Sequence, residues 1–151
     1  MLCVMIDSDE NVNAPKFLPF EGMWLATNPP GAVTCARVVN DRLLIPYSFG
    51  NPEKLTGHYY DCRVFGGKLY CRFEHFDSAM AGIMFLSIGP NHALHGGRWN
   101  IDRISEADRQ DCSRWTESLP GMQPVVWVRI LKRETPDWAE KCFREDWPNK
   151  S

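Results

Sequence analysis

Two strand-like runs on either side of Gly66-Gly67 carry most of the side chains that could do chemistry. A two-residue Gly-Gly connection is typical of a β-hairpin whose turn needs positive φ at both positions, so residues 58–65 and 68–76 are predicted to pair. This register sets His58 opposite His75, at a Cβ separation of about 5 Å. The two imidazoles could share a metal ion or a ligand, but they supply only half of a zinc site. A hydrogen-bonded histidine pair is the alternative.

The same register places Cys62 opposite Cys71 and Asp61 opposite Arg72. Facing cysteines could form a cross-strand disulfide or remain two small buried thiols. In a reducing compartment we expect thiols. The opposed Asp61 and Arg72 predict a cross-strand ion pair, which contributes little to stability when it is exposed.

Glu74 beside His75 suggests general acid–base chemistry, but neighbours on a strand face opposite sides of the sheet. Only a bulge would bring both to one substrate. The sequence contains no serine elbow, phosphate loop or H-E-x-x-H motif. We therefore assign no catalytic residue, and an enzyme using Glu74, Arg72 and Tyr59 as acid and base groups remains an alternative.

The hairpin could turn either of its two faces toward a protein core. One face is mostly apolar and holds His58, Tyr60, Cys62, Val64, Leu69, Cys71, Phe73 and His75. The other is more polar and holds Tyr59, Asp61, Arg63, Tyr70, Arg72 and Glu74. A slip of one residue exchanges the two faces, so both cannot point inward in an uninterrupted ladder. We expect the apolar face inside.

The composition is that of one globular domain. The chain has 151 residues, of which 44% are hydrophobic and 24% charged, and its net charge is −2. The basic residues are scattered, so no footprint for nucleic acid or an anionic membrane is visible. No apolar run is long enough for a signal peptide or a membrane span, and the six cysteines form no C-x-x-C motif. We expect a cytoplasmic protein with reduced thiols, no cofactor, and no nucleic-acid or membrane partner.

Turn signals divide the chain into eight strands. A second hairpin turns at Asn40-Asp41, where both residues tolerate left-handed backbone. A helix capped by Ser105 is predicted to run as far as Pro120, and Thr135-Pro136 should begin a short C-terminal helix. The predicted strands are residues 20–27, 33–39, 42–48, 58–65, 68–76, 79–88, 94–101 and 124–131.

Eight strands joined mostly by short loops predict a mainly β fold, an antiparallel up-and-down barrel with a helix inserted before the last strand and a short C-terminal helix. The competing architecture is an open or sandwich-like sheet. We divide the chain into an N-terminal arm (1–19), the barrel domain (20–132) and a C-terminal helix packed on the barrel (133–151).

Two short stretches resemble the calycin barrels, the group that includes lipocalins and avidins. Gly22-Met23-Trp24 resembles the G-x-W that opens lipocalin barrels. This resemblance implies that Trp24 packs under a basic residue near the last strand, for which Arg129 is the candidate. Leu55-Thr56-Gly57-His58-Tyr59 resembles the avidin stretch L-T-G-x-Y, which implies that Tyr59 points inward and contacts a ligand. Avidins also place binding-site tryptophans on late strands, where Trp99 and Trp127 fall.

The leading functional hypothesis is a barrel that holds a small apolar or aromatic molecule in its cavity. We expect the cavity to be lined by Tyr47, His58, Tyr60, His75, Trp99 and Trp127. Tyr59, Arg72, Glu74 and Arg98 are further candidate ligand contacts, with Arg98 placed near the rim for an anionic group. Arg98 and Trp99 are adjacent, so they should face opposite sides unless Gly96-Gly97 bends the strand. The alternatives are the enzyme above and a filled barrel that acts as a homo-oligomeric scaffold.

Overall fold

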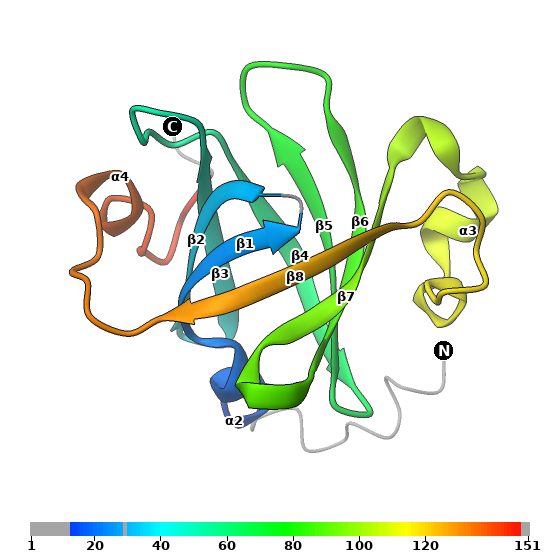
Figure 1. The fold of residues 1–151 in the computed structure, drawn as a ribbon, viewed down its shortest axis with the longest axis horizontal. Helices are drawn as coiled ribbons and strands as arrows, with labels where there is room; N and C mark the ends of the chain where they lie inside the picture. Colours follow the sequence, from blue (N-terminus) through cyan, green and yellow to red (C-terminus); the bar gives the residue numbers. More distant parts are fainter. Residues whose placement is uncertain (1–12, 29, 149–151) are drawn as a thin grey trace.

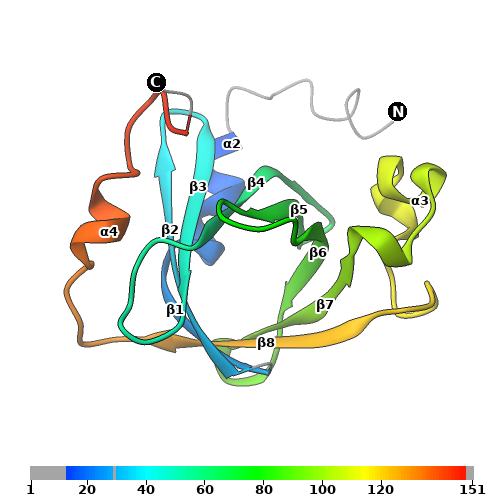
Figure 2. The same cartoon turned by 90° about the horizontal axis from the view of Figure 1, so that it is seen from above.

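The chain folds into a closed antiparallel barrel of eight strands. The computed structural model describes residues 13–28 and 30–148, and each strand pairs with its neighbours in sequence until β8 returns to β1 (Figure 1). Seen from above, the strands enclose a ring with α3 and α4 on opposite sides (Figure 2). The strands are β1 (Gly22–Asn28), β2 (Pro30–Val39), β3 (Arg42–Phe49), β4 (Gly57–Phe65), β5 (Lys68–His75), β6 (Ala81–Ile88), β7 (Leu94–Asn100) and β8 (Gln123–Ile130).

This architecture confirms the mainly β, up-and-down barrel predicted from the sequence and rules out the open sheet. The closing seam joins β1 to β8, where Trp24 pairs with Arg129 and Ala26 with Trp127. In a closed barrel every strand has a neighbouring strand on both sides.

The central hairpin turns where the sequence predicts, with φ values of 59° at Gly66 and 79° at Gly67. Beside the turn the predicted register is confirmed, because Val64 pairs with Leu69. Between Tyr60 and Arg63 the register shifts at a bulge. Asp61 lies there with a φ of 55°, in the left-handed region, and such a bulge reverses the facing of the residues beyond it.

The bulge settles the question of which hairpin face points inward. On the turn side Val64 packs against the main core, as the apolar-face interpretation expects. Beyond the bulge Tyr59 packs against the same core and pairs with Phe73, as the avidin resemblance implies. Each interpretation is therefore right for one half of β4, and the assumption that they exclude each other is wrong.

The bulge also overturns the predicted histidine pair. His58 pairs with Glu74 instead of His75, while His75 lies opposite Gly57. The two imidazoles therefore do not face each other across the hairpin. The described residues contain no group of three or more His, Cys, Asp or Glu side chains that could hold a metal ion.

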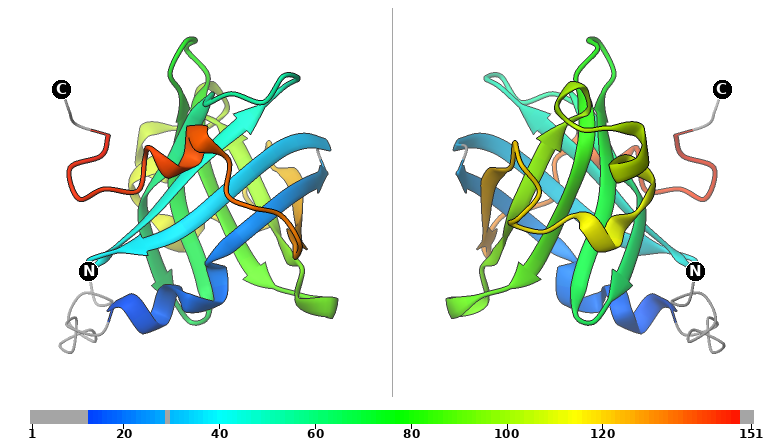
Figure 3. Two further views of the ribbon diagram at one scale, coloured as in Figure 1. Left: turned by 90° about the vertical axis from the view of Figure 1, so that its left-hand side faces the viewer. Right: turned by 90° about the vertical axis from the view of Figure 1, so that its right-hand side faces the viewer.

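Residues 13–20 form two short helices, in a segment where the sequence shows no regular pattern. Helix α2 (Asn13–Phe17) and the 3-10 helix η2 (Leu18–Phe20) lie below one end of the barrel (Figure 3). Phe17 and Phe20 are buried in the main core, so this segment closes that end. Residues 1–12 of the predicted arm lie outside the described residues.

The insertion before β8 is helical in short turns. Ser105 caps α3 (Glu106–Gln110), its hydroxyl accepting a hydrogen bond from the Asp108 amide at 3.1 Å. The helix ends early because Asp111 caps a new 3-10 turn, η5 (Cys112–Arg114). Trp115 is still buried on the outer barrel wall, with Cys112 and Leu119 packed beside it. Two further 3-10 turns, η3 (Pro90–His92) and η4 (Ile101–Arg103), flank β7.

The C-terminal segment covers the opposite outer wall. Helix α4 (Asp137–Glu140) begins one residue later than predicted, with Pro136 at its N-cap. Ala139 packs on β1 and β2, and Cys142 and Trp147 pack on Leu44. In the described segments no helix has both the length and the apolar character needed to cross a lipid bilayer.

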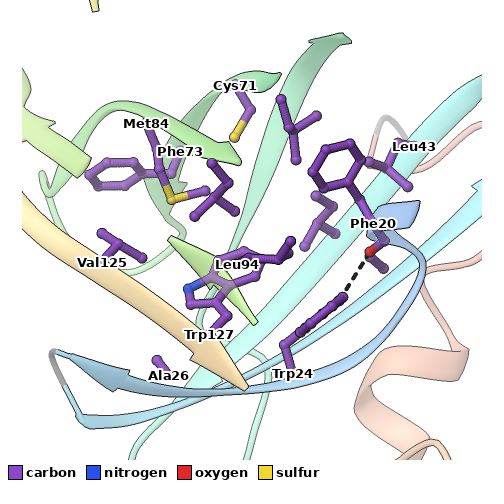
Figure 4. Close-up of a cluster of buried hydrophobic side chains, with 14 of the residues drawn as sticks. Phe20, Trp24, Ala26, Leu43, Cys71, Phe73, Met84, Leu94, Val125 and Trp127 are labelled. Carbon is purple, nitrogen blue, oxygen red and sulfur yellow. Dashed lines mark hydrogen bonds between the residues drawn. The ribbon is translucent and has the colours of Figure 1, made fainter. Parts of the chain in front are cut away.

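The main core fills the barrel interior. Trp24 and Trp127 stand near one another inside it, and the Trp24 indole donates to the Phe20 carbonyl (Figure 4). Its other buried members are Phe17, Ala26, Ala36, Leu43, Ile45, Leu69, Cys71, Phe73, Met84, Leu86, Leu94 and Val125. Side chains therefore pack the closed end of the barrel, and a cavity lies at the other end.

Candidate functional site: an aromatic cavity at the barrel mouth

A cavity of about 160 Å³ opens at the end of the barrel opposite α2. It lies where β1, β3, β5 and β7 end and where β2, β4, β6 and β8 begin. Eleven residues line it: Ala26, Ala32, Tyr47, Phe49, Tyr59, Phe73, His75, Met80, Arg98, Val125 and Trp127. Five of the predicted ligand contacts, Tyr47, Tyr59, His75, Arg98 and Trp127, are thus brought together.

The aromatic rings form a connected wall around the cavity. Tyr59 is central, with its ring centroid 4.8 Å from Tyr47, 5.3 Å from Trp127 and 5.9 Å from Phe73. The Tyr47 ring also meets the His75 ring edge-on at 5.6 Å. Each ring is therefore held by its neighbours, so this wall exists before any ligand arrives.

Polar groups in the cavity are few. The Tyr47 hydroxyl donates to the Glu74 carbonyl at 3.2 Å, which fixes that ring. Burial raises the pKa of the Tyr47 phenol, and burial likewise raises the pKa of Tyr59. Burial lowers the pKa of His75, and the nearby charge of Arg98 lowers it further. At neutral pH the phenols and the imidazole are uncharged, and Arg98 is the cation of the cavity.

Arg98 reaches the cavity from β7, with its guanidinium carbon 5.9 Å from the Phe73 ring centroid. Its Nε atom is buried and has no hydrogen-bond partner. No acidic residue lines the cavity. Arg98 and Trp99 face opposite sides of β7, as adjacent strand positions should, so Gly96-Gly97 does not bend them onto one face.

Trp99 and Arg72 lie on the outer wall, away from the cavity. Trp99 is buried under the insertion with Ile83 and Trp115, and its indole donates to the Leu119 carbonyl at 3.1 Å. The expectation that Trp99 walls the cavity is therefore wrong. The guanidinium of Arg72 donates to Asp61 at 3.3 Å, so the predicted cross-strand ion pair forms despite the bulge.

His58, Tyr60 and Glu74 also lie outside the barrel. His58 is 2% exposed and stacks between Tyr60 and Phe76, while Trp147 meets it edge-on. Its Nε2 atom is 2.9 Å from a Glu74 carboxylate oxygen. Burial lowers the pKa of His58 more than the bond to Glu74 raises it. Glu74 and Arg72 consequently do not share the interior with Tyr59, which removes the acid–base set considered for an enzyme.

Sequence reasoning missed several residues of the cavity. Phe73 was predicted inside but not at the ligand, and Phe49 and Met80 belong to loops or strand ends whose direction no periodicity reveals. Ala26 and Val125 give no chemical signal, because small apolar residues are common in any strand. Their contribution is the open volume between the larger rings.

A second cavity follows the seam between β3 and β4. The ladder between these strands holds three residue pairs, from Ile45–Tyr59 to Tyr47–Gly57, whereas β4 and β5 share seven. A space of about 200 Å³ opens where the two strands separate, lined by Asp41, Arg42, Leu43, Leu44, His58, Tyr59, Tyr60, Asp61 and Cys62. The bulge at Asp61 accounts for this separation, because a bulge bends its strand.

At the closed end, Trp24 and Arg129 meet as the lipocalin resemblance implies. The Arg129 guanidinium carbon lies 4.2 Å from the Trp24 ring centroid. Its two terminal nitrogens donate to the carbonyls of Glu21 at 2.7 Å and Pro19 at 3.3 Å. This arginine joins the last strand to the N-terminal helices and the first strand.

Together, the fold and the cavity define the class: an eight-stranded up-and-down β-barrel with one aromatic-walled mouth and one end closed by helices. Comparison of the chain with protein-family models, with curated proteins and with solved structures finds no match. The functional argument therefore depends on the geometry of the mouth cavity.

Proposed function

We propose that this protein binds a small apolar or aromatic molecule in the mouth cavity. The observation that carries the proposal is a preformed ring of aromatic side chains around about 160 Å³ of open space. An apolar cavity of similar size engineered into another protein accepts benzene, so this volume suits one aromatic ring with a short substituent. Binding sites of this type are mostly apolar, with a few placed polar groups.

We also propose that the barrel is calycin-like. The support is the stacking of Arg129 on Trp24 beneath the Gly22-Met23-Trp24 stretch, together with the inward position of Tyr59 at the mouth. Homo-oligomerisation and a cytoplasmic location remain predictions of the sequence.

The test is a titration of the full chain with benzyl alcohol and indole, followed by calorimetry and by thermal shift. We expect saturable binding, with a stabilisation of ~2.7 kcal/mol when the ligand is at one hundred times its dissociation constant. Ala32→Met should remove this response, because the new side chain occupies the cavity that Ala32 lines.

The matched control is Ala107→Met, the same substitution at an exposed position of α3. This variant should bind as the wild type does. Equal responses from both variants would place binding outside the mouth cavity, and no response from the wild type would contradict the proposed function.

A further inference from the structure

We propose that the molecule bound at the mouth is an aromatic monoanion whose carboxylate pairs with Arg98. The inference rests on the proposed function and adds the charge of the ligand to it. It also assigns a role to the one cationic side chain of the cavity.

The first observation is the missing partner of Arg98. Its Nε atom is buried and has no hydrogen-bond partner, and its guanidinium carbon lies over the Phe73 ring, 5.9 Å from the ring centroid. Seven other guanidinium groups of the described chain are engaged in ion pairs, and those of Arg42 and Arg129 donate to main-chain carbonyls. The ion pairs involve Arg37, Arg63, Arg72, Arg109, Arg114, Arg133 and Arg144.

The second observation is the absence of competing charge in the cavity. Its eleven lining residues include no Asp or Glu. His75 adds no second positive charge at neutral pH, because burial and Arg98 both lower its pKa. A buried donor without a partner costs free energy, so a ligand that supplies an anionic acceptor gains more at this site than a neutral one of the same shape.

The third observation concerns geometry. Arg98 enters from β7 while the aromatic wall is built from Tyr47, Tyr59, Phe73 and Trp127. A ring lying against this wall would place a substituent attached directly to it, or one carbon away, toward the guanidinium. Arginine binds a carboxylate through two parallel hydrogen bonds, which would engage the free Nε atom.

Benzoate and its neutral isostere benzamide test the proposal by isothermal titration calorimetry on the full chain. We expect benzoate to bind at least about tenfold more tightly than benzamide, because charge-assisted hydrogen bonds are about twice as strong as neutral ones. Acetate, which has the charge without the ring, should bind far more weakly than benzoate.

Arg98→Met should abolish the preference, so that benzoate binds no more tightly than benzamide to this variant. Arg98→Lys should retain part of the preference, since lysine keeps the charge but not the paired hydrogen bonds. Arg63→Met is the matched control, because Arg63 lies on the outer face with 53% of its side chain exposed. This control should bind both probes as the wild type does.

A melting curve of each free variant reports folding separately. Arg98→Met should melt no lower than the wild type, because it removes a buried donor without a partner. If the wild type binds benzoate and benzamide equally, or if Arg98→Met keeps the preference, the anion proposal is wrong while the proposed function stands. If neither probe nor any neutral aromatic binds, both proposals fail.

Discussion

An arginine meets an aromatic ring at each end of this barrel, but the two arginines are bonded very differently. At the closed end Arg129 lies on Trp24 and donates to two main-chain carbonyls. At the mouth Arg98 lies near Phe73 with a buried nitrogen unpaired. The closed end is complete without a further molecule, whereas the mouth has an unused donor and open space. The comparison separates the part of the barrel that stabilises the fold from the part that can recognise a ligand.

Removing the ring at the closed end should have the largest effect. Trp24 is fully buried, and its indole donates to the Phe20 carbonyl at 3.0 Å. Trp24→Ala should lower the free energy of unfolding by about 3–5 kcal/mol, as expected for a large buried aromatic residue. Urea denaturation measures this. Trp138 lies in α4 and is only half-buried. Trp138→Ala should therefore lower the free energy of unfolding clearly less than Trp24→Ala does. Equal losses would show that the closed end is not the centre of stability.

Exchanging the two arginines for methionine tests the comparison directly. Arg129→Met loses two charge-assisted hydrogen bonds and the stacking on Trp24, and it should lower the unfolding free energy by about 1.5–3 kcal/mol. Arg98→Met should cause no loss, for the reason given above. Urea denaturation curves of the two variants and the wild type, measured in parallel, compare the two changes in unfolding free energy. A larger loss at Arg98 than at Arg129 would reverse the assignment of the two ends.

The smallest expected effect is at the bulge that turns Tyr59 into the mouth. Asp61 has a φ of 55°, a conformation that costs a residue with a branched Cβ about 1–2 kcal/mol. Asp61→Val should destabilise the barrel by that amount in thermal unfolding. Asp61→Asn is the control, because asparagine tolerates this backbone while losing the charge that pairs with Arg72. Similar losses in both variants would assign the effect to the ion pair instead of the backbone.

Local signals were sufficient for much of the architecture. Gly66-Gly67 and Asn40-Asp41 each predict a tight turn, and both hairpins form there. The pairing of Trp24 with Arg129 could likewise be predicted from the resemblance of one tripeptide and the position of one basic residue. The two turns depend on the conformational preferences of a few adjacent residues, whereas the contact of Trp24 with Arg129 follows from the resemblance.

The facing of the site residues could not be predicted in the same way. One aspartate inside a strand gives no reliable sign of a bulge, yet Asp61 reverses the direction of His58 and Tyr59. Trp99 looks like a cavity residue until the insertion is seen to cover it from outside. His58 is buried by Trp147, almost ninety positions along the chain. The errors at Trp99 and His58 have a common cause, because both faces of these strands are covered and hydrophobicity does not distinguish inside from outside.

The short ladder between β3 and β4 makes this strand interface the place where the barrel wall should open most easily. Three residue pairs connect the two strands, and one of them, Ile45–Tyr59, includes the central ring of the aromatic wall. Small opening motions of the wall should concentrate where the fewest pairs resist them. The ease with which this interface opens therefore determines how far the Tyr59 ring can move, and this movement sets the size of the largest ligand that the mouth cavity can accept.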